Sequence, residues 1–484
     1  KSSAASDVYK RQPVQESTLP VYKCSSSSKY FSSDTKSFHL RSGILFCNVS
    51  GTLICKLQLS LCIIVNCPNM FLFFSSIYGL LHAQESPLQL SLKDAEKMFL
   101  ERNLSLIAER YNIDKAQAQV TQARLFDNPV ISLEQNVYNR LNGKYFDVGK
   151  EGEATAEIEQ VINLAGQRNK RVRLEKVNKE IAEHQFEEVL RTLRSELNKT
   201  FVEICFSTRS IGIYDKEIES LSLLMKAFRE QQNKGNISLL ESSRLESLLL
   251  SLRKEKNEQE NNLVNLRGEL NLLLSLPAGQ DIDLLLDDDI LKQVDTAAVP
   301  FADMDNMLSV RPDLKMAHSN VTAAKANLKL QRSMAAPEFS IKGMYDRAGN
   351  FINNYFAVGV SVSVPIFNRN QGNIKSAKID IMQNGKEEEY AIEKARMELY
   401  AAYSQLQKAV ELYRSSNDEL EHNFGRLIEG VNANFRKRNI SMLEFIDYYQ
   451  SYKETCLQLY ELKKDVFLAM ENLNTIVGQT VFNY

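Results

Sequence analysis

The stretch KGNISLLE at residues 234–241 returns 203 positions later as KRNISMLE at residues 437–444. Further upstream, NPVISL at residues 128–133 matches APEFSI at residues 336–341, at an offset of 208. The two similar offsets indicate that two halves of the chain correspond, rather than two isolated motifs. A duplication of this size predicts pseudo-equivalent modules that close around an axis. Such an arrangement favours a conduit over a catalyst.

The composition of the 484 residues is typical of long helices. The chain has only 19 glycines and 10 prolines, and it has no tryptophan. Its formal net charge of -2 gives no electrostatic reason to expect a nucleic-acid partner. Five of the seven cysteines precede residue 70, and the body keeps only Cys205 and Cys456. The sequence therefore predicts neither a disulfide framework nor a metal site built on cysteine.

The N-terminal region differs from the rest of the chain. Residues 1–69 are rich in serine and have no helical period, so we interpret them as a non-native or disordered N-terminal extension. Residues 70–84 hold a short apolar run followed by a small residue, which predicts a secretory signal peptide. The alternative is a membrane anchor at about residues 61–81, although two asparagines and a proline interrupt that run.

Each half of the body is predicted to contain one strand hairpin. The alternation is clearest in the second half, where one strand face is apolar and the other is small or polar. Two interpretations fit: half-buried strands of a soluble sheet, or strands with lipid on one side and water on the other. Because a lone hairpin is unstable, the hairpins must join each other or those of other subunits. The apolar face of that strand comprises Phe356, Val358, Val360, Val362 and Val364. The repeats and their strands are predicted at residues 90–276 (strands at about 129–139 and 153–163) and 301–484 (strands at about 337–346 and 355–366).

Long helices follow each hairpin. Residues 166–234 lack proline and would form a helix of roughly 100 Å at 1.5 Å per residue. In the next helix, a seam of alternating four- and three-residue steps runs from Leu245 to Leu273, and an offset of 203 places its copy from Tyr448 to Ile476. A further helix is predicted at residues 92–123.

An acidic segment separates the two repeats. Residues 277–300 contain five aspartates, and we predict a solvated acidic linker, with wrapping around the helices as one arrangement of it. The alternative for this segment is a cation site. The aspartates are Asp281, Asp283, Asp287, Asp288 and Asp289.

Catalytic signals are weak throughout the sequence. His184, His318 and His422 have no carboxylate or cysteine at the spacing of metal ligands. No phosphate loop, nucleophile elbow or dinucleotide fingerprint is present. We therefore predict no enzyme activity, no cofactor and no metal site.

Taken in order, the duplicated markers resemble the TolC-like outer membrane efflux proteins, also called outer membrane factors. The markers are the prolines before the first strands (Pro129 and Pro337) and the helix-tip turns at residues 235–241 and 438–444. The strand-to-helix segments at residues 160–168 and 364–372 complete the set. The first of these segments looks most like the branch of heavy-metal and cation exporters.

The resemblance implies a mainly α-helical fold with a small β part, assembled as a homotrimer. Each subunit would give four strands to a twelve-stranded outer-membrane β-barrel and its helices to a periplasmic α-helical barrel. The protein would be the exit duct of a tripartite efflux system. Its partners would be outer membrane lipid, a periplasmic adaptor protein and an inner-membrane pump of the resistance-nodulation-division or ABC type.

The resemblance also suggests functional residues at the helix tips. Glu241, Glu444 and Asp447 match positions where the family places acidic residues around the periplasmic aperture. Arg438 departs from the family's usual glycine, and the plain alternative is a charged, solvated helix end. The tip residues expected to contact the adaptor are Gly235, Asn236, Ser238, Arg438, Asn439 and Ser441.

Three other functions remain open at this stage. A type I protein secretion duct would have the same architecture. A periplasmic adaptor would normally have one helical hairpin between lipoyl-like and barrel strands, without a full duplication. A soluble coiled-coil scaffold would lack both the export signal and the alternating strands.

Overall fold

The computed structural model describes residues 88–294, 300–348, 352–416 and 419–484. The predicted extension (1–69) and signal peptide (70–84) lie outside the described residues. Within the described ranges, every helix is too short or too polar to cross a membrane.

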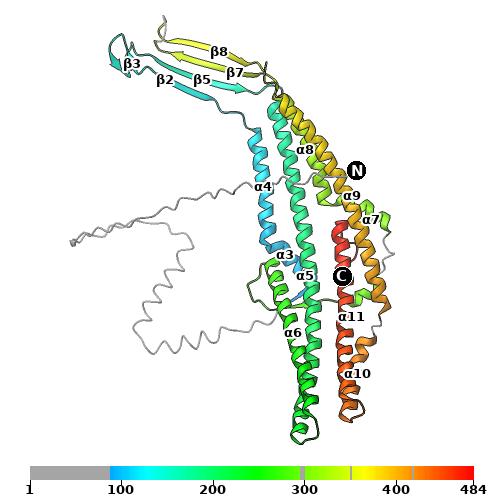
Figure 1. Cartoon of the computed structure of the whole chain (residues 1–484). Helices are drawn as coiled ribbons and strands as arrows, with labels where there is room; N and C mark the ends of the chain where they lie inside the picture. The colour runs from blue at the N-terminus through cyan, green and yellow to red at the C-terminus, as the bar shows by residue number, and fades with distance from the viewer. Residues whose placement is uncertain (1–87, 295–299, 349–351, 417–418) are drawn as a thin grey trace, which may run out of the picture. The chain divides into compact units, whose positions relative to one another are not determined.

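The first half of the described chain runs from a short strand and two helices into strands, and then into two long helices (Figure 1). The long helix α5 starts at a left-handed residue, Gly166 with φ 66°, which turns the chain sharply out of the preceding strand. The elements are β1 (Leu88–Ser91), α3 (Leu92–Arg102), α4 (Leu104–Arg124), β2 (Val130–Gln135), β3 (Tyr138–Asn139), β4 (Lys144–Tyr145), β5 (Ala154–Ile162), α5 (Gln167–Asn233) and α6 (Leu239–Leu273).

The second half repeats the order of helix, hairpin and long helices. Asn370, with φ 57°, is the left-handed residue that precedes α9, and it is equivalent to Gly166 before α5. The elements are β6 (Ile282–Leu285), η2 (Asp289–Gln293), α7 (Phe301–Met307), η3 (Leu308–Val310), α8 (Pro312–Ser333), β7 (Glu338–Asp346), β8 (Tyr355–Ser363), α9 (Gln371–Ser415), α10 (Glu419–Arg436) and α11 (Met442–Val477).

The two hairpins join in one antiparallel sheet. The strand order is β2-β5-β7-β8, so β5 from the first repeat pairs directly with β7 from the second. The register places Ile158 opposite Gly343 and Ile341 opposite Val360. The hairpins therefore join within one chain, as one of the predicted alternatives required.

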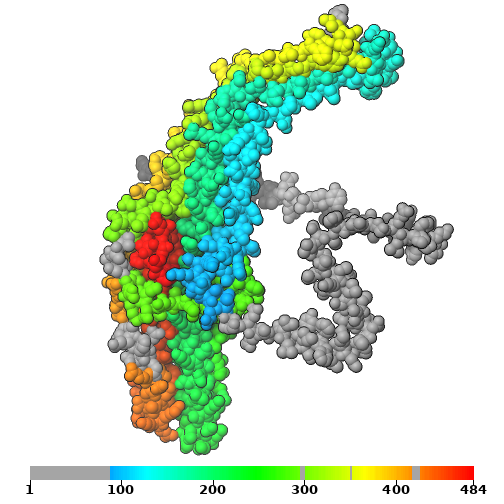
Figure 2. Space-filling view, turned by 180° about the vertical axis from the view of Figure 1, so that it is seen from behind, coloured from blue at the N-terminus to red at the C-terminus, as the bar shows by residue number. Residues whose placement is uncertain are grey.

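The helices connect this sheet to two turns at the opposite end of α5. This helix has 67 residues, or about 100 Å at 1.5 Å per residue. Along its length α5 packs against α4, α6, α8 and α11, while α11 also packs against α9 and α10. Figure 2 shows the two hairpins together at one end, and the α5–α6 and α10–α11 turns at the other.

Apolar residues form three buried clusters along the helices. One surrounds Phe99 and Phe201 between α3, α5 and α6, and another surrounds Phe206 and Phe467 between α5, α9 and α11. The third lies near the turns, around Leu245 and Phe445. Because side chains of both repeats enter the second and third clusters, burial of apolar surface holds the repeats together.

The helix predicted at residues 92–123 is broken at Asn103. The buried side chain of Asn103 accepts a hydrogen bond from the N–H of Leu106 at 2.9 Å and donates one to the carbonyl of Leu273 at 2.8 Å. Asparagine side chains compete for backbone groups in this way and favour helix ends over helix interiors. One predicted helix is therefore two, α3 and α4.

The acidic segment at residues 277–300 packs against the helices, and part of it is buried rather than solvated. Strand β6 within it pairs in parallel with β1, and Ile282 and Leu291 are buried. Its aspartates also have partners, since Asp288 accepts a hydrogen bond from Lys463 at 3.0 Å. Ile282, Leu284 and Leu286, at alternate positions, pack against the helical core, and this apolar face is obscured by the charge count of the segment.

The second helical seam is displaced from its predicted register near the turn. The predicted residue Tyr448 is 50% exposed, whereas its neighbour Tyr449 is only 2% exposed. The buried residues there are Phe445 and Tyr449, which lie four positions apart and whose tilted rings are in contact, with centroids 4.6 Å apart. Large aromatic side chains fill the space that leucines fill in the first repeat, so a strict offset of 203 fails here.

Candidate functional site

One face of the four-stranded sheet is apolar and exposed. Phe356 and Val358 are 76% and 84% exposed, although both are large apolar side chains. Cross-strand pairing carries the same face over the other strands. An apolar surface of this kind marks a contact with another protein or with lipid. The face comprises Ile131, Leu133, Ala156, Ile158, Gln160, Ile162, Phe339, Ile341, Gly343, Tyr345, Phe356, Val358, Val360 and Val362.

The opposite face of the sheet is mostly small and polar. Lys342 lies between two carboxylates of the neighbouring strand, with its Nζ atom 2.9 Å from Glu157 Oε1 and 3.1 Å from Glu159 Oε2. Ser340 lies opposite Ser361 on the same face. The sheet can therefore separate an apolar surrounding from an aqueous one.

Both edges of this sheet are open within the described residues. Strand β2 pairs only with β5, and strand β8 pairs only with β7. The outer backbone N–H and C=O groups of these strands have no neighbouring strand in the sheet. An open edge is a template for pairing with another chain, and no such edge is stable in lipid.

At the other end of the helices, two turns have the same backbone hydrogen bonds. In the first, the N–H groups of Gly235 and Asn236 donate to the carbonyls of Gln232 and Gln231. In the second, Arg438 and Asn439 donate to Phe435 and Asn434, the corresponding positions. Gly235 has φ 75° and Arg438 has φ 60°, so an arginine adopts the left-handed backbone that glycine adopts more readily.

Each turn leads into a capping box that sequence reasoning missed. The Glu241 carboxylate accepts a hydrogen bond from the Ser238 N–H at 3.0 Å, and the Ser238 hydroxyl accepts one from the Glu241 N–H at 3.2 Å. Ser441 and Glu444 repeat these bonds at 2.7 and 3.3 Å. The spacing Ser-x-x-Glu before an apolar run is the sequence signal for such a box.

The capping bonds affect two of the three carboxylates predicted at the aperture. Hydrogen bonds from the backbone and hydroxyl of Ser238 hold the pKa of Glu241 below its usual value, and Ser441 does the same for Glu444. Both carboxylates are exposed and remain charged near neutral pH. Asp447 is also exposed, one helical turn beyond Glu444.

The residues predicted to contact an adaptor are all exposed at these two turns. The side-chain amide of Asn236 donates to the Gln231 side chain at 2.8 Å, and Asn439 donates likewise to Asn434 at 3.1 Å. The structure thus places the exposed tip residues in two matching groups, one on each turn.

Beneath the turns, a cluster of aromatic and polar contacts joins the α5–α6 helical hairpin to the α10–α11 helical hairpin, and we call this cluster the lock. Phe228 of α5 stacks on Phe435 of α10 at 5.6 Å between ring centroids, and Phe435 stacks on Phe445 of α11 at 4.3 Å. The Tyr449 hydroxyl lies 2.8 Å from the Ser220 hydroxyl and donates to Asn432 at 2.8 Å. These contacts link α5 to both α10 and α11.

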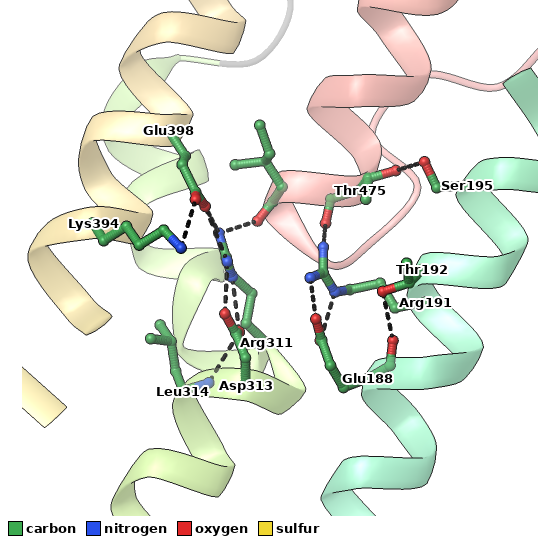
Figure 3. Close-up of polar contacts among 11 residues, drawn as sticks. Glu188, Arg191, Thr192, Ser195, Arg311, Asp313, Leu314, Lys394, Glu398 and Thr475 are labelled. Atoms are coloured by element: carbon green, nitrogen blue, oxygen red, sulfur yellow. Dashed lines mark hydrogen bonds and ion pairs between the residues drawn. The ribbon is translucent and has the colours of Figure 1, made fainter. Parts of the chain in front are cut away.

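Two arginines hold the other end of α11 (Figure 3). Arg191 of α5 donates to the carbonyl of Thr475 at 2.6 Å, and the buried Arg311 donates to the carbonyl of Ile476 at 3.2 Å. Arg311 is also paired with Asp313 at 2.7 Å and with Glu398 at 3.1 Å. Arginine at the final carbonyls complements the negative end of a helix, so α11 is anchored away from the turns.

The described residues contain no group of three or more His, Cys, Asp or Glu side chains placed to hold a metal ion. His184 is paired with Glu187 at 3.4 Å, three residues further along the helix, so the prediction that it has no carboxylate at such a spacing is wrong. The exposed His318 lies 2.8 Å from Glu388. The side chain of His422 lies outside the described residues. These histidines belong to separate helix surfaces and do not gather into a site.

Comparison with known proteins identifies the family. The model of the outer membrane efflux protein family matches residues 97–275 and 304–479. The cobalt-zinc-cadmium resistance protein CzcC of Cupriavidus metallidurans is 21% identical over 289 residues, covering 60% of this chain and 66% of that protein. The pyoverdine export outer membrane protein OpmQ of Pseudomonas putida is 21% identical over 234 residues, covering 45% and 46%. The match therefore spans less than two thirds of either relative's length.

Solved structures share the fold. Crystal structures of CusC superpose with a TM-score of 0.67 at 19% identity, over 80% of this chain and 92% of that chain. The outer membrane channel CmeC of Campylobacter jejuni superposes with a TM-score of 0.66 at 15% identity, over 81% and 87%. The resemblance in the sequence is confirmed: this chain belongs to the outer membrane efflux protein family and is a protein of the outer membrane.

Proposed function

We propose that this chain is the outer membrane exit duct of a tripartite efflux system, which passively conducts solute from the periplasm to the exterior. The observation that carries this proposal is the sheet with one exposed apolar face, one polar face and two open edges. Lipid would cover the apolar face, and the polar face would line water. The long helices would extend the water-filled path into the periplasm.

The open edges support assembly as a homotrimer. Four strands are too few to close a barrel, whereas three chains would supply twelve. Strand β2 of one subunit would pair with β8 of the next, which would satisfy the backbone groups at both edges. The exposed side chains of Tyr390, Met397 and Tyr400 on α9 would be covered in the same assembly.

Passive conduction fits the chemistry of the tips. Carboxylates of Glu241, Glu444 and Asp447 from three subunits would form acidic rings that favour cations and repel anions. Because the capping bonds keep the first two ionised, the rings would stay charged at periplasmic pH. The exposed turns would meet a periplasmic adaptor, and an inner-membrane pump would provide the driving force.

The names of the two relatives favour small solutes as cargo. One is a metal-resistance protein and the other a pyoverdine exporter. We therefore propose efflux of metal cations or small molecules rather than secretion of proteins. Family membership sets aside the adaptor and scaffold alternatives.

The test is charge selectivity in planar lipid bilayers. The triple variant Glu241→Gln, Glu444→Gln and Asp447→Asn should have a lower cation-to-anion permeability ratio than the wild type. This ratio is obtained from the reversal potential measured in a salt gradient. Glutamine retains the capping geometry, so the helices should still form. Glu101→Gln, an exposed carboxylate on α3, is the matched control and should leave the ratio unchanged. If the wild-type protein forms no channel, the proposed duct is contradicted. If the triple variant forms channels with an unchanged ratio, the proposed aperture is contradicted.

A further inference from the structure

A buried carboxyl lies between the two helical hairpins, near the lock. Glu217 of α5 is only 3% exposed, and its Oε1 atom has no hydrogen-bond partner among the described residues. An ionised carboxylate with an unpaired oxygen is expensive to bury, whereas its protonated form is much less so. Glu217 is therefore most stable either as a neutral, protonated group in its buried position or as an ionised group exposed to water.

Three other helices place charged or titratable groups around this carboxyl. Lys453 of α11 acts to lower the pKa of Glu217, but its Nζ atom already lies 2.7 Å from Glu255 Oε2 on α6. Lys453 also lies 6.0 Å from the centre of the Tyr214 ring on α5. One ammonium group thus serves two carboxylates when Glu217 is ionised. The remaining neighbours are Tyr214 of α5 and Tyr449 and Tyr452 of α11. Asn432 and Arg436 of α10 act through Tyr449, and Glu258 of α6 acts through Tyr214.

The cluster lies at the contact that joins the hairpins. The pair Lys453–Glu255 links α11 to α6, and the Tyr449 hydroxyl links α11 to α5 and α10. Separation of the α10–α11 hairpin from α5 and α6 would break these bonds and admit water to Glu217. We propose that Glu217 is a proton-controlled latch: its neutral carboxyl keeps the two hairpins together, and its ionisation loosens them.

The direction of the pH effect follows from burial. Desolvation raises the pKa of Glu217 from 4.5 to about 8 while the hairpins are packed. Once they part, the exposed carboxyl returns towards its ordinary pKa. At pH values between these two pKa values, Glu217 is protonated when the helical hairpins are packed and ionised when they are separated. The stability of the packed state therefore falls as the pH rises through that range. Below the lower value the latch is complete, and above the upper value its contribution is lost.

Five other groups near the tips have pKa values shifted away from this window. The pKa values of Glu241 and Glu444 are lowered, so both stay ionised across it. Burial raises the pKa of Tyr214 to about 12, and the pKa values of Tyr449 and Tyr452 are also raised, so these phenols stay neutral. The response can therefore be assigned to Glu217 by substitution.

Hydrogen–deuterium exchange of the purified full chain tests the latch. After correction for intrinsic exchange rates, protection of residues 442–460 in α11 should fall at least about tenfold between pH 6 and pH 8, since linkage allows up to tenfold per pH unit. Glu217→Gln and Glu217→Met, which cannot ionise, should keep the protection seen in the wild type at pH 6. Two variants are used so that a folding defect in one leaves the other informative.

The matched control is Asp215→Asn on the same helix. Asp215 is exposed and is paired with Lys256 at 2.7 Å, so this variant loses a carboxylate but no buried one. It should keep the wild-type pH response. The latch is refuted if wild-type protection is flat from pH 6 to 8, or if both Glu217 variants follow the wild type. Exchange needs no pump or flux, so its failure would leave the proposed duct intact; only the effect of the latch on conduction rests on that proposal.

Discussion

The sheet exposes its large apolar side chains, whereas the helical tips bury their aromatic ones. In the sheet, Val358 and Val360 point into open space at 84% and 62% exposure. At the tips, Phe445 and Tyr449 are almost completely buried. The exposed residues of the turns themselves are polar, while Leu239, Leu240 and Leu443 beside the turns are exposed as well. Both regions come from the same duplicated sequence, yet only the tips have the polarity expected of a protein in water.

The difference indicates two environments for one chain. A sheet whose large side chains face outward gains nothing from water, but it does gain from an apolar surrounding. The tips bury their rings between hairpins and complete their own helix ends with serine and glutamate. In the proposed duct the sheet would depend on lipid and neighbouring subunits, whereas the helix ends of each tip are completed within the chain itself.

Loss of the central tip ring should have the largest effect. Phe445→Ala removes a fully buried side chain that contacts two other rings, and it should destabilise the tip by about 3–5 kcal/mol. The effect should be equal in detergent and in lipid, because the tip lies outside the membrane. Leu443→Ala, at an exposed neighbouring position, is the control and should change stability by less than about 0.5 kcal/mol. Hydrogen exchange of α11 in both variants measures the difference.

A charge on the sheet should act only in lipid and only on one face. Val360→Arg, in the middle of β8, should destabilise the inserted protein by about 2–4 kcal/mol, the range for arginine near the centre of a bilayer. Ser361→Arg places the same charge on the opposite face and should have a much smaller effect. Urea unfolding from lipid vesicles gives both values. Equal losses at the two positions would remove the distinction between the faces.

The smallest effect compares the two turns with each other. Arg438→Gly should stabilise the second tip by about 1 kcal/mol, because glycine adopts a φ of 60° without the steric penalty that arginine meets. The reciprocal change, Gly235→Ala, should destabilise the first tip by a similar amount. Thermal unfolding of both variants measures this. A less stable Arg438→Gly variant would mean that the arginine side chain, which acts electrostatically on Glu241, contributes more than its backbone strain.

Periodicity and duplication predict the long helix α5, the strand β8 and both turns, because these features are written in local residue patterns. The sequence also contains both Ser-x-x-Glu capping boxes, although their bonds become evident only in the structure. The break at Asn103 depends on a hydrogen bond to Leu273, 170 residues away, and no local pattern reports such a contact. The pairing of β6 with β1 is equally remote in sequence.

The other features that the sequence did not predict arise from packing between the two repeats. Tyr449 takes the buried position because its hydroxyl bonds to Ser220 of α5 and Asn432 of α10, contacts that a fixed offset cannot express. Glu217 lies among ordinary helical residues, and its burial follows only from the approach of α6 and α11. The aperture carboxylates and adaptor contacts remain predictions from the resemblance.

The edges of the sheet provide the most direct test of this account. Cryo-electron microscopy of the full chain in lipid nanodiscs should resolve three copies, with β2 of each subunit hydrogen-bonded to β8 of the next and with Val358 and Val360 facing lipid. A monomer whose sheet edges remain open, or one whose apolar face packs against its own helices in water, would contradict it.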